Sequence, residues 1–91
     1  MKLEGYSTEK ENLKAVRINA FNIQYIKNPS EAVQLAAVKE DGLAIRYIKT
    51  SDDEIILTAL ETADETSIWA FLVNNDYEAL SDEVKLAIQL K

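Results

Sequence analysis

The strongest constraint on the fold is that the chain repeats itself with a period of 22 in the residue numbering. Residues 15–36, AVRINAFNIQYIKNPSEAVQLA, align with residues 37–58, AVKEDGLAIRYIKTSDDEIILT, and seven of the 22 pairs are identical. Most other pairs are conservative, such as Arg17 with Lys39 and Val33 with Ile55. Self-similarity at one fixed period is typical of repeat proteins, in which each unit buries its apolar face against its neighbours.

The repeat extends in both directions, although less closely. Upstream, Leu13 and Ala15 take the places of Leu35 and Ala37, and downstream SDEVKLAI resembles SEAVQLAA. We therefore expect one helical-repeat domain over residues 1–91, with units at about 7–28, 29–50 and 51–80 and a terminal capping helix at 81–91.

Local signals indicate that each unit is a pair of helices, one long and one short. Asn28–Pro29–Ser30–Glu31 is typical of a helix start with Asn28 as N-cap, and Asp41–Gly42 is typical of a helix end. Thr50 or Ser51 is expected to start the next helix. Only two Gly and one Pro are present, too few for the turns of a β-sandwich. The sequence predicts an all-α array of short helix pairs without a sheet.

The apolar pattern predicts which side chains form the shared core. We expect Tyr25 and Tyr47, a repeated pair, to belong to it with their hydroxyls at its rim. The aliphatic members of the predicted core are Ile23, Ile26, Val33, Leu35, Ile45, Ile48, Ile55 and Leu57.

The text AVKEDGLAIRYI, preceded by PSEAVQLA, resembles a helical-repeat family of bacterial, phage and giant-virus proteins known as domain of unknown function 4116. The match is closest at residues 30–48 and weaker at 8–26 and 51–72. The resemblance implies a helical repeat and a bacterial or viral origin. It brings no catalytic residues with it, because each position of the motif has a core, cap or turn role.

The third unit departs from the period. Ile55 and Val84 hold equivalent positions, but their separation exceeds one period by seven residues; we place two of these near Asp64–Glu65 and the rest at 75–80, around Tyr77. In this alignment Trp69 takes the core position of Ile23 and Ile45. A shift by one residue would instead place Trp69 on the surface, where it would be a strong interface anchor. We expect the core position. The inserted loop is either a functional loop or a longer connection.

Charge is divided unevenly along the chain, whose net charge is −6. Residues 1–49 carry eight Lys or Arg and six Asp or Glu, whereas residues 50–84 carry ten acids and no base. Such a surface attracts basic partners and repels nucleic acid. Five of the ten acids fall in predicted first helical turns, where they favour the helix dipole anyway. An acidic interface and a solvated acidic surface therefore remain alternatives.

Several functional classes have no support in the sequence. The chain has no Cys and no His, and no phosphate loop, dinucleotide fingerprint, nucleophile elbow or calcium loop. We predict a protein that is not an enzyme and has no cofactor and no metal site. The N-terminal residues lack the apolar segment of a signal peptide, and no apolar run could span a membrane. We expect a cytoplasmic location, in a bacterial cell or in the host of a phage.

Two functions fit these observations. The first is a protein-binding module, an acidic phage-type inhibitor that blocks a basic host protein involved in nucleic-acid binding or defence. The second is a structural adaptor whose unpaired terminal helix self-associates. Salt separates them, because only the first complex should weaken steeply with ionic strength. For the first function, the predicted partner-binding residues are Asp64, Glu65, Trp69, Asp76, Tyr77 and Glu78.

Overall fold

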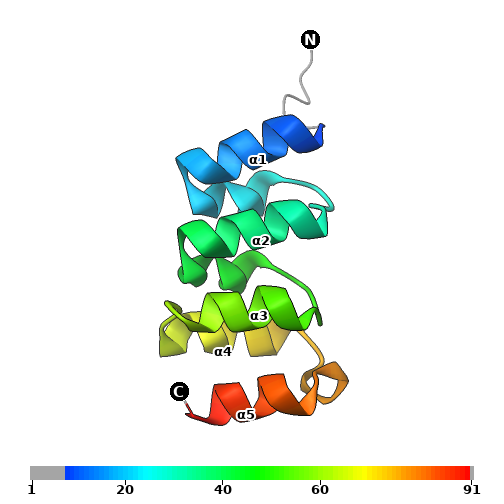
Figure 1. Ribbon diagram of the computed structural model, residues 1–91, viewed down its shortest axis with the longest axis vertical. Helices are drawn as coiled ribbons and strands as arrows, with labels where there is room; N and C mark the ends of the chain where they lie inside the picture. Colours follow the sequence, from blue (N-terminus) through cyan, green and yellow to red (C-terminus); the bar gives the residue numbers. More distant parts are fainter. Residues whose placement is uncertain (1–7, 91) are drawn as a thin grey trace.

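The computed structural model describes residues 8–90, which form a stack of helices in two layers (Figure 1). Five α-helices and three 3-10 helices are present, and this part of the chain contains no strand, so the all-α prediction is confirmed. The first layer holds four α-helices in sequence order, and the second layer lies behind them. The first layer consists of α1 (Glu9–Ile18), α2 (Glu31–Glu40), α3 (Asp53–Leu60) and α5 (Asp82–Leu90). The other elements are η1 (Ala20–Tyr25), η2 (Gly42–Tyr47), α4 (Glu65–Asn74) and the linking η3 (Tyr77–Ala79).

The spacing of the helices follows the sequence pattern closely at first. Helices α1 and α2 begin and end one repeat period apart, and so do η1 and η2. The N-caps Thr8, Ser30 and Asp52 have the same spacing, and each accepts a hydrogen bond from the backbone N–H three residues later. The spacing then lengthens. Helix α4 begins one residue later than the repeat period would place it after η2, and α5 begins seven residues later than the period would place it after α3.

Two helix starts lie later in the chain than expected. Asn28 is not the N-cap of α2; it adopts φ 53°, a left-handed conformation that Asn tolerates, and Ser30 caps the helix instead. Neither Thr50 nor Ser51 caps α3. Asp52 does so, while the Thr50 hydroxyl accepts a hydrogen bond of 3.0 Å from the Asp52 N–H. In both cases the polar residue nearest the helix is the cap, because its side chain can reach the free N–H groups of the first turn.

The tyrosine prediction was wrong, because both tyrosines lie off the buried face of their 3-10 helices. A 3-10 helix has three residues per turn, so residues three apart lie on one face. Ala20, Ile23 and Ile26 occupy the buried face of η1 and its end. Tyr25 lies on another face and is 72% exposed, and its counterpart Tyr47 on η2 is 42% exposed. The repeated tyrosines are therefore surface residues.

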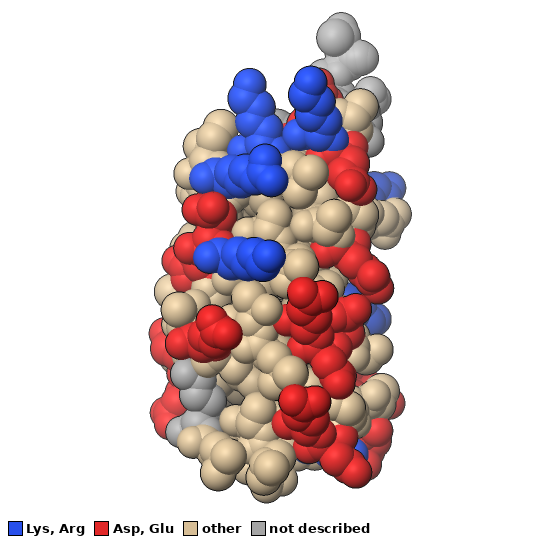
Figure 2. Space-filling model, in the orientation of Figure 1, with Lys and Arg blue, Asp and Glu red and all other residues tan. Residues whose placement is uncertain are grey.

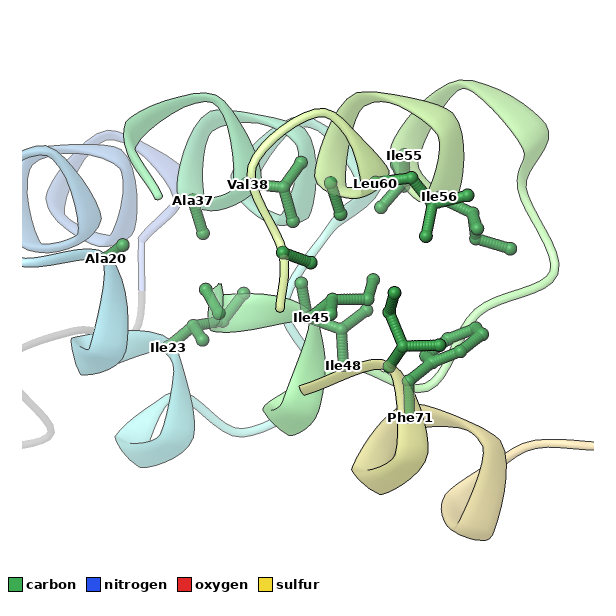
Figure 3. Close-up of a cluster of buried hydrophobic side chains, with 14 of the residues drawn as sticks. Ala20, Ile23, Ala37, Val38, Ile45, Ile48, Ile55, Ile56, Leu60 and Phe71 are labelled. Carbon is green, nitrogen blue, oxygen red and sulfur yellow. The ribbon is translucent and has the colours of Figure 1, made fainter. Parts of the chain in front are cut away.

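The core lies between the two layers and runs the length of the stack (Figure 3). Six of the eight predicted aliphatic core residues are buried. The exceptions are Leu35 and Leu57, which are only half-buried against the core. Leu35 lies about 200° round the helix from the buried Val33, at the edge of the core. Ile56, which was not predicted, is only 1% exposed.

Gly42 is required by a close approach between segments rather than by a turn. Its φ is not positive. A Cβ at this position would collide with the carbonyl oxygen of Ala59 and the hydroxyl of Thr62, and would lie 2.8 Å from the backbone N of Ala63. The Gly42 N–H donates a hydrogen bond of 2.8 Å to the Thr62 hydroxyl. Gly42 thus lets the start of η2 pack directly on the end of α3.

Candidate protein-binding surface

The position of α4 in the second layer decides where Trp69 lies. Asp64 caps α4 as Asp41 caps η2, and the two caps are separated by one period and one further residue. One residue is therefore extra before α4, rather than the expected two. Ile68 and Phe71 occupy the buried positions of Ile45 and Ile48.

Trp69 therefore falls one position past the core residue Ile68, where η2 has Arg46, and is 70% exposed. The predicted core position for this residue was wrong. The alternative alignment, shifted by one residue, places it correctly.

Polar contacts fix α4 against the preceding unit. The guanidinium of Arg46 donates two hydrogen bonds to the fully buried Ser67 hydroxyl, at 2.8 and 3.3 Å. At the other end of α4, the Asn75 amide donates to the carbonyl oxygens of Phe71 and Ile48, and its oxygen accepts from the Thr50 N–H at 2.8 Å. Trp69 thus stands on a helix that is held at both ends.

A shallow groove of about 280 Å³ lies beside Trp69. Glu65, Ile68, Trp69 and Leu72 of α4 line one side, and Ile88 of α5 lines the other. Glu65 and Trp69 are four residues apart, so they share one face of the helix. The groove is apolar, with one carboxylate on its rim.

The outer face of α5 is also apolar. Leu86 is 57% exposed and Leu90 is 77% exposed. Leu86 lies two residues after the core residue Val84. Leu35 and Leu57 lie two residues after Val33 and Ile55, so the three leucines hold equivalent positions of the repeat. Leu35 and Leu57 are half-buried against the core. Leu86, in the last helix of residues 8–90, is exposed instead.

A polar cluster forms at η3, on the opposite end of α4 from Glu65. The Lys85 ammonium of α5 lies 3.4 Å from a Glu78 carboxylate oxygen and 5.3 Å from the centre of the Tyr77 ring. The Gln89 amide donates to the Tyr77 hydroxyl at 3.3 Å. Tyr77 is thereby half-buried against α5 and serves to join η3 to that helix.

The six predicted partner-binding residues fall into two groups rather than one. Asp64, Glu65 and Trp69 belong to the first half of α4. Asp76, Tyr77 and Glu78 belong to η3, beyond the other end of that helix. Ten helical residues span about 15 Å, so one small contact cannot cover both groups. Sequence reasoning missed Leu72, Ile88 and Leu86, although the repeat alone shows that the Leu86 position follows Leu35 and Leu57.

The charged side chains are segregated along the stack (Figure 2). Basic side chains gather over α1 and α2, and acidic ones dominate the lower half of this face, over α3 and α5. Of the ten acids between residues 50 and 84, eight are exposed and the other two, Asp52 and Asp53, are half-buried. The C-terminal half therefore presents a strongly negative surface next to the groove.

Besides Asp52, which caps α3, two more of these acids have structural roles. The Asp64 carboxylate accepts a hydrogen bond of 2.8 Å from the Ser67 N–H. This bond, helped by one from the Ser67 hydroxyl and by the charge of Arg46, lowers the pKa of Asp64 below its usual value of 3.8. Asp76 caps η3 by accepting from the Glu78 N–H at 3.0 Å. Both residues are exposed and cap a helix with one carboxylate oxygen, so their replacement would also remove a cap.

Other kinds of site are not found in the part of the chain that the structure describes. Residues 8–90 contain no group of three acidic side chains placed to hold a metal ion. None of the helices within these residues is long and apolar enough to cross a membrane.

No family model, no curated protein and no solved structure matches the chain. The resemblance to domain of unknown function 4116 therefore rests on the repeat text alone and stays a prediction.

Proposed function

We propose that this protein is a non-enzymatic binding module that attaches to a basic protein through its C-terminal half. In this proposal it acts as an inhibitor by covering the basic surface with which the partner binds nucleic acid. The observation that carries the proposal is the negative surface of residues 50–84, which contains ten acids and no base.

The arrangement of the acids supports an interface, because helix capping does not explain all of them. Caps and first turns account for many of them, yet Glu61 follows the end of α3 and is exposed. Glu54 and Glu65 lie in first turns, but they are exposed and cap no helix. Opposite charges on a partner would speed its approach and fix its orientation.

The exposed Trp69 supports the same half of the molecule as the contact surface. Tryptophan is enriched among the residues that contribute most to protein interfaces, and a 70% exposed indole is unusual for an isolated chain. Trp69 lies one helical turn from Glu65, so an apolar anchor and a charge stand together.

A matched pair of charge reversals tests the proposal. One variant carries Glu54→Lys, Glu61→Lys and Glu65→Lys; the control carries Glu11→Lys, Glu31→Lys and Glu40→Lys in the N-terminal half. All six glutamates are exposed, and each set has two first-turn residues and one near a helix end. Both sets change the net charge equally, and neither includes an aspartate N-cap.

The assay is capture of proteins from a bacterial lysate at low and at high salt, followed by mass spectrometry. We expect the parent and the control to retain a basic protein at low salt and to lose it at high salt, and the C-terminal variant to retain none. If the two variants behave alike, the acids are only a solvated surface and the proposal fails.

The exposed leucines of α5 favour a second candidate, a self-associating adaptor. Leu86 and Leu90 could pack on a second copy. Sedimentation of the isolated chain separates the two candidates, because apolar self-association persists or strengthens at high salt, whereas capture of a basic protein weakens.

A further inference from the structure

We propose that the groove between α4 and α5 binds an amphipathic helix of the partner, with apolar side chains against Trp69, Leu72 and Ile88 and basic side chains along its edges. This inference rests on the proposed function and specifies how the partner is held. It assigns the apolar contact to one groove and the electrostatic contact to the acids around it.

The stacking of the layers indicates that a helix fits this position. In the earlier units, η1 packs against both α1 and α2, and η2 packs against both α2 and α3. Each first-layer helix is thus followed by a second-layer helix behind it. Within residues 8–90 no such helix follows α5. A docked helix would lie below α4 and behind α5, as η2 lies relative to η1 and α2.

The surfaces that would meet this helix are apolar on both sides. Leu72 is half-buried and Trp69 exposed on α4, and Ile88 is half-buried on α5. Ile88 stands where α2 and α3 have the fully buried alanines Ala37 and Ala59. A longer side chain at this position extends the apolar wall of the groove. Helix-in-groove binding uses such walls to hold apolar residues one turn apart.

The charges around the groove favour a basic helix over a second copy of this chain. Glu65 lies on the rim, and Glu61 and Asp64 precede it, all exposed. The nearby Lys85 ammonium already contacts the Glu78 carboxylate and the Tyr77 ring, at the η3 end of α5. Two copies meeting at this end would oppose like charges, whereas lysine or arginine on a partner helix would face carboxylates.

The fluorescence of Trp69, the only tryptophan of the chain, reports directly on the groove. The probe is a synthetic helix of about fourteen residues, long enough to match α4, with leucine on one face and lysine on the other. Its control has the same leucines with glutamate in place of every lysine. We expect the lysine peptide to shift the Trp69 emission to shorter wavelength in a saturable way, and the glutamate peptide to leave it unchanged.

Variants identify the binding site. Leu72→Glu should abolish the shift, and Glu65→Lys should weaken binding about two- to five-fold. Ile18→Glu, at an exposed isoleucine of α1 at the far end of the stack, should bind as the parent does. Because Leu72→Glu could disturb folding, Trp69→Ala provides a second test. Its side chain is mostly outside the core, and calorimetry should show a loss of about thirtyfold with unchanged helicity.

Three results would overturn the proposal. The first is equal binding of the lysine and glutamate peptides or no binding of either. The second is unchanged affinity in Trp69→Ala. The third is a concentration-dependent shift of the Trp69 emission in the chain alone, together with dimer formation in sedimentation, which would make a second copy the occupant.

These results are distinct from those that test the proposed function. If lysate capture depends on the acids but not on Trp69 or Leu72, the function stands and the groove is not its helix site. If the peptide binds but no basic protein is captured, the proposed function fails and the groove chemistry stands.

Discussion

The two ends of the helical stack depart from the inner helices at different positions of the repeat. At the first end, Glu11 of α1 occupies the position where α2 and α3 have the buried Val33 and Ile55, and it is exposed. At the other end, Leu86 of α5 keeps the leucine of the inner helices although no helix of residues 8–90 covers it. Helix α1 exposes Glu11, together with Ile18 near its end, whereas α5 exposes Leu86 and Leu90.

The charges make the same distinction. Basic side chains lie over the first two helices, and acidic side chains lie over the last ones (Figure 2). The C-terminal half combines exposed leucines, an exposed tryptophan and exposed acids, and the proposed binding surface rests on these features.

The largest effect is expected from a substitution in the buried face of α4. The groove beside Trp69 depends on the orientation of this helix. Phe71→Ala should lower the free energy of unfolding by about 3–5 kcal/mol, because the ring is 2% exposed in the core. Val73→Ala on the same helix is the control; this residue is 77% exposed, and we expect a change within about 0.5 kcal/mol. Urea denaturation measures both. Equal losses would mean that α4 is rotated and that Trp69 does not face solvent.

A smaller loss of stability is expected at the contact between η2 and the end of α3. Gly42→Ala should destabilise the protein by about 1–3 kcal/mol, since the added methyl group would collide with backbone atoms of the α3 end. Thermal unfolding followed by circular dichroism measures the loss. A neutral or stabilising result would show that η2 and α3 can separate without cost, and the close stacking of inner units would then be wrong.

The leucine comparison can be tested directly by the same substitution at an inner helix and at α5. Leu57→Glu, at an inner helix, should cost about 1–2 kcal/mol because a half-buried leucine is lost. Leu86→Glu, at the equivalent position of α5, should change stability by less than about 0.5 kcal/mol. Chemical denaturation of the two variants side by side gives the comparison. If Leu86→Glu costs as much as Leu57→Glu, Leu86 is already covered within the isolated chain.

The smallest effect concerns the cap of α4. Because its hydrogen bonds lower the pKa of Asp64, the ionised carboxylate stabilises the folded state. This contribution is fully present above the usual value of 3.8 and is lost as the pH falls through the lowered folded value. Asp64→Asn keeps a capping oxygen but cannot titrate, so its stability should fall less steeply below about pH 4.

The control for this prediction is Glu40→Gln, which removes one exposed carboxylate that does not cap a helix. Asp64→Asn should differ from the parent more than Glu40→Gln does. If Asp64→Asn and the parent coincide, the Asp64 cap does not contribute to the pH dependence of folding.

The sequence by itself determined the fold class and the place of most helices. The repeat aligned apolar residues such as Ile23 with Ile45 and Val33 with Ile55, and all four are buried. Cap residues gave the approximate helix starts, with errors of two residues or fewer at Ser30 and Asp52, because several polar residues in a row compete for the same free N–H groups. The uneven charge along the chain also appears on the folded surface.

Only the tertiary structure decided which side chains near the core face solvent. A single-residue difference in the connection before α4 turns Trp69 by about 100°, from the core to the surface, and text alignment could not show how many residues are extra there. Tyr25 and Tyr47 likewise face solvent, because the isoleucines two residues before and one residue after each tyrosine occupy the buried face. The groove arises from α4 and α5 together, and neither segment shows it alone, because its two walls are brought together by the packing of the helices.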